Sequence, residues 1–187
     1  MAATFTRMDQ SSSEEWMHIG TESAKNQGRV AERVLVLLRS LAEITDGFAT
    51  DQLTHCLQTA TRAERAGADP EVVLASLCHD IGKAISVPNH PAIAAEILRP
   101  YVRREVYEMI RVHQDFQGRH YYAYFGADPD ARETHRAELD ADTFALAERF
   151  ADEWDQTAFD PDYDTLPLEH FEPLVHELFA HGQLVAP

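Results

Sequence analysis

The sequence predicts an all-α protein with a single helical domain. Apolar residues recur at the three- and four-residue spacing of helix faces, and no stretch alternates apolar and polar residues as a half-buried strand does. A chain of 187 residues, of which 44% are hydrophobic, is long enough for one well-buried core and needs no second one. We therefore expect residues 27–187 to form one helical bundle.

The first 26 residues differ from the rest of the chain. They are polar, contain the run SSSEE, and show no sustained helical period. Chain ends of this kind are commonly poorly ordered unless they dock on the domain. We therefore predict that residues 1–26 form a mobile N-terminal arm.

The boundaries of the helices follow from residues that start and stop them. Asp46-Gly47 ends the first helix and Gly67 the second, whereas Asp69 can cap the third and Pro70 suits its first turn. The expected helices cover residues 29–44, 50–67, 70–82, 91–99, 103–114, 141–157 and 168–180.

The charge balance excludes several classes of partner. Acidic residues number 32 against 16 Lys and Arg, a net charge of -16, which repels nucleic acids. No apolar run reaches the roughly 20 residues of a membrane span, and the start lacks the order of a secretion signal. We expect a cytoplasmic protein with no membrane or nucleic-acid partner, and the sequence indicates no oligomeric state. Cys56 and Cys78 are expected to be small buried residues rather than ligands or a disulfide.

A histidine-aspartate pair ends the most apolar helix. Burying His79 and Asp80 is costly unless a metal ion or a mutual hydrogen bond compensates, and the pair alone leaves both possibilities open. His55 precedes His79 by 24 residues, on the other side of the turn at Gly67. Two antiparallel helices place these histidines at the same height, which favours a shared metal over two separate core residues.

Three later residues extend the pattern. His90 stands at a helix start, His113 near the end of an amphipathic helix, and Asp155 at the end of another. A single aspartate on such a helix is usually solvated, so Asp155 gains weight only from the other candidates. The candidate ligands thus follow the order His, His-Asp, His, His and Asp along the chain.

This order resembles the ligand order of dinuclear HD-domain proteins. The stretch LTHCLQTATRAERAGADPEVVLASLCHDIGK, residues 53–83, is similar in particular to small oxygenases that cleave the carbon–phosphorus bond of 1-hydroxyphosphonates. A looser similarity extends to inositol oxygenase, and the resemblance covers roughly residues 45–180. It implies an HD-domain helical bundle.

The resemblance also implies a ligand scheme. His55, His79, Asp80 and Asp155 would hold one iron, and Asp80 would bridge to a second iron completed by His90 and His113; His79 and Asp80 would thereby serve catalysis. A donor set rich in imidazole suits iron, zinc or manganese alike. Only the resemblance implies a mixed-valent Fe(II)/Fe(III) pair with O2 as co-substrate.

The activity that the resemblance implies is O2-dependent cleavage of a small phosphonate. We expect 1-hydroxy-2-(trimethylammonio)ethylphosphonate as substrate, giving glycine betaine and phosphate, because Tyr121 and Phe48 could cage the quaternary ammonium. The ordinary alternative is that these rings pack the loop onto the core.

Basic and amide side chains are candidates for holding the phosphonate. Lys83, one turn beyond Asp80, leads them as a point charge. Gln117, Arg119 and Arg132 lie where the family supplies further contacts, and the alternative for each is a solvated side chain. The chain departs from the best-known relative in carrying Lys83 instead of histidine, and in carrying Asp152 where a basic residue is expected.

A metal-dependent phosphohydrolase acting on a phosphoester or nucleotide is the main alternative. Most HD-domain proteins split phosphoesters with a metal-activated water, and HDIGK is common among them. The additional pair His90 and His113 favours the oxygenase, although dinuclear phosphodiesterases keep such a pair; their GYP signature is absent here. A third possibility, a metal-free signalling or scaffold module, fits poorly with the complete ligand set.

Overall fold

The computed structural model describes residues 2–182, in which the regular secondary structure is helical and no strand occurs. The all-α, single-domain prediction is confirmed. The α-helices are α1 Ser13–Gln27, α2 Val30–Ser40, α3 Gln52–Arg65, α4 Pro70–Cys78, α5 His90–Leu98, α6 Arg104–Gln117, α7 Ala141–Arg149 and α8 Leu168–Phe179.

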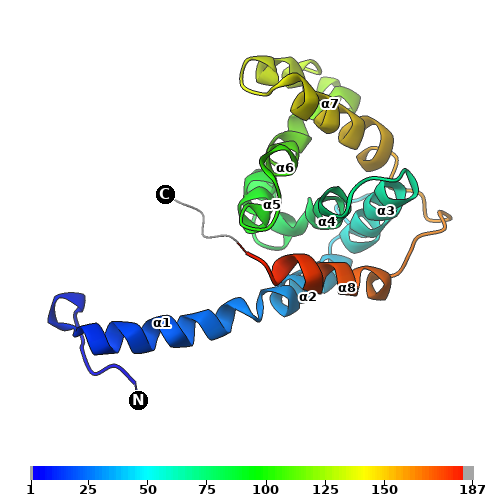
Figure 1. The fold of residues 1–187 in the computed structure, drawn as a ribbon. Coiled ribbons are helices and arrows are strands. Elements are labelled where there is room, and N and C mark those ends of the chain that lie inside the picture. Colours follow the sequence, from blue (N-terminus) through cyan, green and yellow to red (C-terminus); the bar gives the residue numbers. More distant parts are fainter. Residues whose placement is uncertain (1, 183–187) are drawn as a thin grey trace.

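Helix α4 forms the centre of the bundle. It contacts α3, α6 and α8, while α5 packs on α6 and α8 packs on α2 (Figure 1). Every residue of α4 from Val72 to Cys78 is buried, which explains why its sequence is apolar on all sides. Cys56 and Cys78 are both buried and free, as expected.

The predicted stops and caps explain the hairpin of α3 and α4. The Asp51 side chain accepts a hydrogen bond from the backbone N–H of Thr54 at 2.9 Å, and Asp69 caps α4 in the same way. Gly67 turns the chain with a φ of 73°, which favours glycine. Helix α4 ends at Cys78, earlier than predicted, because a 3-10 turn over Ile81–Ala84 (η3) follows His79 and Asp80.

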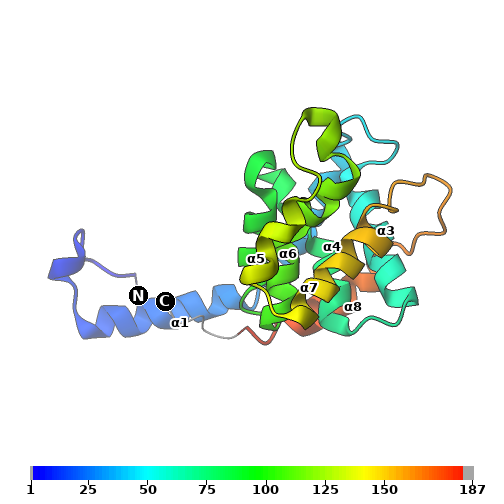
Figure 2. The same cartoon turned by 90° about the horizontal axis from the view of Figure 1, so that it is seen from above.

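Helix α1 is not apparent from apolar spacing. Its N-cap Ser12 and Glu15 form a reciprocal capping box, and the helix projects away from the bundle in both views (Figures 1 and 2). It contains no buried residue, so it has no core face and no apolar period. The capping box was the sequence signal for this helix, and the mobility of the arm stays a prediction.

Because α1 buries nothing, we expect deletion of residues 1–26 to leave the stability of the bundle unchanged. The thermal midpoint should shift by less than about 2 °C, the smallest shift expected from a loss of 1 kcal/mol in a domain of this size. Scanning calorimetry of the full chain and of residues 27–187 measures it. A drop of several degrees would show that the arm contributes to the core.

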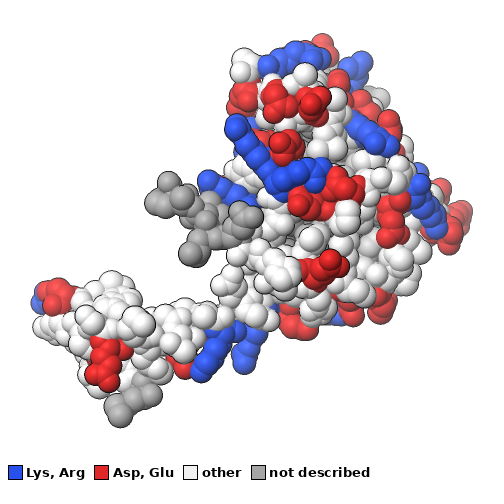
Figure 3. Space-filling view, in the orientation of Figure 1, with Lys and Arg blue, Asp and Glu red and all other residues white. Residues whose placement is uncertain are grey.

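Surface charges of both signs are mixed. On the face shown in Figure 3, Lys and Arg side chains lie among Asp and Glu side chains. Within residues 2–182, no helix combines the length and apolar character needed to cross a membrane.

Candidate metal centre

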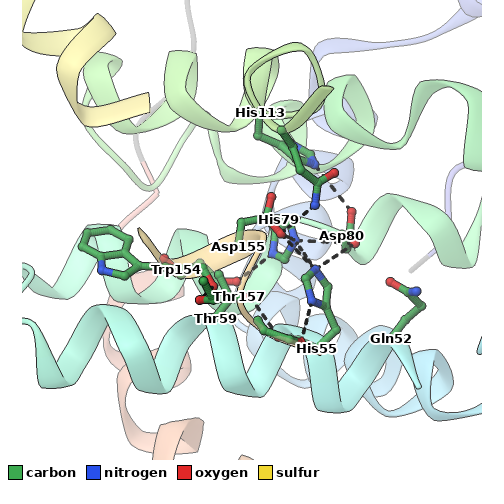
Figure 4. A network of polar contacts seen from close by, with 12 residues as sticks. Gln52, His55, Thr59, His79, Asp80, His113, Trp154, Asp155 and Thr157 are labelled. Carbon is green, nitrogen blue, oxygen red and sulfur yellow. Dashed lines mark hydrogen bonds and ion pairs between the residues drawn. The ribbon is translucent and has the colours of Figure 1, made fainter. Parts of the chain in front are cut away.

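The six predicted ligands converge in the interior of the bundle. Figure 4 labels five of them: His55, His79, Asp80, His113 and Asp155. Each is at most 6% exposed, so none is a solvated surface residue. They come from α3 (His55), the end of α4 (His79 and Asp80), the start of α5 (His90), α6 (His113) and the end of the turn η8, Phe150–Asp155 (Asp155).

One group of donors contains His55, His79 and Asp155. Their ligand atoms lie within 4.8 Å of one another. The Nε2 atom of His55 is 3.0 Å from Nε2 of His79 and 3.1 Å from Oδ1 of Asp155. Three buried donors at this spacing can hold one metal ion.

The carboxylate of Asp80 connects this group to a second one. Its Oδ2 atom lies 3.6 Å from Nε2 of His55 and 3.5 Å from Nε2 of His79. Its Oδ1 atom faces the other side, 3.0 Å from Nε2 of His90 and 3.6 Å from Nε2 of His113. Each oxygen therefore serves a different pair of histidines, which is the arrangement of a bridging carboxylate.

Backbone carbonyls fix the tautomer of the four histidines. A carbonyl oxygen can only accept, so each Nδ1 carries the hydrogen and Nε2 of the neutral ring keeps a lone pair for a metal. The Nδ1 atoms donate to carbonyl oxygens at 3.0 Å (His55 to Ala158), 2.9 Å (His79 to Ser76), 2.7 Å (His90 to Val87) and 2.7 Å (His113 to Ile110).

This donor set fits metal ions. Lone pairs of the Nε2 atoms and of the carboxylates face one another, and buried Asp80 Oδ1 and Asp155 Oδ2 have no hydrogen-bond partner among the described residues. Buried acceptors without donors are costly, and cations between them would remove this cost. Imidazole and carboxylate donors suit iron, zinc or manganese.

Without metal, protons and Lys83 compensate the carboxylates. Burial alone would raise the pKa of Asp80 and Asp155, but the nearby histidines, His79 above all, lower both pKa values. Burial also acts to lower the pKa of His79, yet the two carboxylates raise it well above its usual value. The Lys83 Nζ atom lies 2.7 Å from Asp80 Oδ2. Incoming metal must displace this positive charge.

A π-helical turn delivers Asp155. The predicted helix over 141–157 is divided into α7 and the π-helical η8, in which the N–H of Gln156 bonds to the carbonyl of Ala151, five residues earlier, at 3.1 Å. Such wide turns shift the register of the helix and are frequent at functional sites. Apolar spacing gave no signal for this turn.

Gly82, two residues after Asp80, allows the backbone of His90 to pack closely against it. A Cβ atom at this position would lie 2.3 Å from the carbonyl oxygen of His90 and 2.7 Å from its Cα. Only glycine fits this contact, which seats His90 beside Asp80.

A cavity of about 610 Å³ adjoins the centre. Four of the predicted substrate contacts line it: Phe48, Lys83, Gln117 and Tyr121. Its other lining residues are Asp46, Val87, Pro88, His90, Gln114, His120, Phe125, Gln156 and Phe159. Lys83 also donates to Gln52 Oε1 at 2.9 Å, and Gln117 donates to Asp155 Oδ1 at 3.0 Å.

Arg119 and Arg132, also predicted as substrate contacts, are not among the residues that line this cavity. Arg132 is buried, and its guanidinium donates to both carboxylate oxygens of Asp152, at 3.0 and 2.9 Å, and to the carbonyl of Phe116 at 2.8 Å. Its terminal nitrogens are therefore already engaged. Arg119 is exposed and lies outside the cavity lining.

Phe159, which the sequence analysis missed, forms an aromatic wall with Phe48 beside His55. The ring of Phe159 stacks on His55 with centroids 4.2 Å apart and on Phe48 at 4.5 Å. Gln58 holds this segment through two hydrogen bonds to the backbone of Asp160, at 2.7 and 3.2 Å. The available signal was Gln58 itself, a polar residue one turn beyond His55 on the buried face of α3.

The sequence profile of the HD domain matches residues 53–160, more than half of the chain. This protein belongs to the HD domain family. Proteins with an HD domain are generally metal-dependent enzymes, hydrolases or oxygenases, and the buried histidines and aspartates of this HD domain are arranged to hold metal. No curated protein matches the chain.

Proposed function

We propose that this HD domain protein is a dinuclear iron oxygenase that cleaves the carbon–phosphorus bond of a 1-hydroxyphosphonate. The observation that carries the proposal is the position of Asp80, whose two oxygens face separate pairs of histidines. This arrangement supports two adjacent metal positions, as the reaction requires, instead of one.

The cavity supports a small zwitterionic substrate. Among the described residues, Lys83 is the only lysine or arginine that lines it, and Asp46 is the only carboxylate. A nucleotide carries several negative charges that one lysine would compensate poorly. The rings of Phe48, Tyr121, Phe125 and Phe159 provide faces for a quaternary ammonium group. These features favour 1-hydroxy-2-(trimethylammonio)ethylphosphonate.

The residues of the chain would bind and orient this substrate. Lys83 would neutralise a phosphonate oxygen, and Gln117 would hold the Asp155 carboxylate in its orientation. The burial of the ligands would keep water from the reacting carbon. The iron pair would supply Lewis acidity and a binding position for O2. A hydroxyphosphonate and O2 give a carboxylate, hydrogen phosphate and a proton, so no external reductant is needed.

A phosphoester hydrolase is the second candidate. Lys83 lies 2.7 Å from Asp80 Oδ2, where it could also polarise a phosphoryl oxygen. The donor set is equally suited to zinc or manganese, the ions of many hydrolytic centres.

Oxygen uptake distinguishes the two candidates. We expect the iron-loaded protein to consume one O2 for each phosphate released from the trimethylammonio hydroxyphosphonate, measured with an oxygen electrode and by ³¹P NMR. Phosphocholine, which carries the same ammonium group on a phosphoester, is the matched control and should stay intact. Zinc- or manganese-dependent phosphoester hydrolysis without O2 uptake would refute the oxygenase.

A further inference from the structure

A second polar network connects the cavity to the interior of the bundle. It consists of His120, Asp152 and Arg132, none of which is a candidate metal ligand. His120 lines the cavity, and its Nε2 atom lies 2.9 Å from Asp152 Oδ1. Asp152 in turn receives two hydrogen bonds from Arg132.

Burying the charged side chain of Arg132 at this position costs free energy. Its side chain is 1% exposed, and a buried guanidinium contributes little net stability even when it is paired. Its bidentate contact fixes both oxygens of Asp152, while Glu148 lies 3.6 Å away and Phe116 accepts a further hydrogen bond. Such a contact serves better to hold a carboxylate in one orientation than to stabilise the fold.

The fixed carboxylate determines which nitrogen of His120 is open to a ligand. Burial acts to raise the pKa of Asp152, but the hydrogen bonds and charges of Arg132 and His120 lower it, so the carboxylate is ionised and accepts. The Nε2 atom of His120 therefore carries the hydrogen of this bond. Its Nδ1 atom has no protein partner within residues 2–182, and the residue faces the cavity.

We propose that His120 is a substrate-binding residue that donates a hydrogen bond from Nδ1 to an anionic oxygen of the ligand. Asp152 and Arg132 are positioning residues, because they act through His120. In this contact each ring nitrogen donates one hydrogen bond, Nε2 to Asp152 and Nδ1 to the ligand. The inference deepens the proposed function by adding His120 to Lys83 as a contact for the phosphonate group.

Binding of inorganic phosphate tests this contact without turnover. We expect His120→Gln to weaken phosphate binding to the zinc-loaded full chain about tenfold, the effect of one charge-assisted hydrogen bond. Isothermal titration calorimetry gives the affinity, and metal content and melting temperature check the fold of each variant. His135→Gln is the matched control, since His135 bonds to Asp115 at 2.8 Å but lies outside the cavity lining.

A double-mutant cycle tests the positioning role. Asp152→Asn should weaken phosphate binding in the wild-type background and change it little in the His120→Gln background, because its effect passes through His120. Additive losses would refute the positioning role. Unchanged phosphate affinity in His120→Gln, or a wild type that binds no phosphate, would refute the contact itself. His120-dependent phosphate binding without O2 uptake would leave this inference standing and overturn the oxygenase.

Discussion

Asp80→Asn should remove both metal ions together. Each carboxylate oxygen faces a different pair of histidines, and an amide supplies one weak oxygen donor and an N–H2 group that repels a cation. We expect the affinity for each ion to fall by more than about 100-fold, since loss of a mere supporting partner already costs 10- to 100-fold. Metal analysis of the dialysed protein measures the loss, and O2 uptake should vanish with it.

Asp155→Asn is the informative comparison for Asp80→Asn. Asp155 belongs to the group of His55 and His79 and has no contact with His90. Its substitution should weaken one ion and leave the other bound. Retention of one ion at full affinity in Asp80→Asn would show that Asp80 does not bridge, and the centre would then be mononuclear.

Gly82→Ala should disrupt the second metal position and destabilise the fold. The new methyl group would meet the backbone of His90 at 2.3 Å, and a backbone cannot swing aside as a side chain does. Overpacking of this kind costs about 1–3 kcal/mol, which corresponds to a fall in melting temperature of about 2–12 °C for a domain of this size. Scanning calorimetry and metal analysis follow the two effects.

Gly20→Ala provides the control for Gly82→Ala. No heavy atom lies within 4 Å of a Cβ atom at this position, which is exposed on α1. The same change of residue should therefore leave metal content and the melting temperature of the bundle unaltered. Two bound ions and an unchanged midpoint in Gly82→Ala would mean that the segment of His90 can relax freely.

The part of the centre that could be predicted depends on local geometry. Counting residues across the turn at Gly67 placed His55 beside His79, because the rise of a helix is fixed and the connection is short. The structure brings their Nε2 atoms within 3.0 Å. The helical class followed in the same way from apolar spacing.

The features of the centre that could not be predicted depend on contacts between segments distant in the sequence. Arg132 was a candidate for the phosphonate because it is basic, yet Asp152 and the carbonyl of Phe116 take its donors. The hydrogen-bond partners of a charged side chain depend on how α6, α7 and the turns pack together. Local sequence patterns do not predict this packing. Apolar spacing also failed to predict two other elements. The π-helical turn before Asp155 breaks the helical period, and helix α1 has no buried face and therefore no apolar period.

The hydrogen bonds behind the imidazoles have a consequence for how the centre assembles. His79, His90 and His113 each donate to a carbonyl three residues earlier in the chain, so their own backbone turns orient them. His55 instead donates to Ala158, 103 residues further on. Three rings are thus preset as soon as their turns form, whereas His55 acquires its orientation only when the chain closes over it. Loosening the segment of Ala158 and Asp160, which Gln58 holds in place, would therefore disorder the ring of His55 and leave the other three histidine rings oriented.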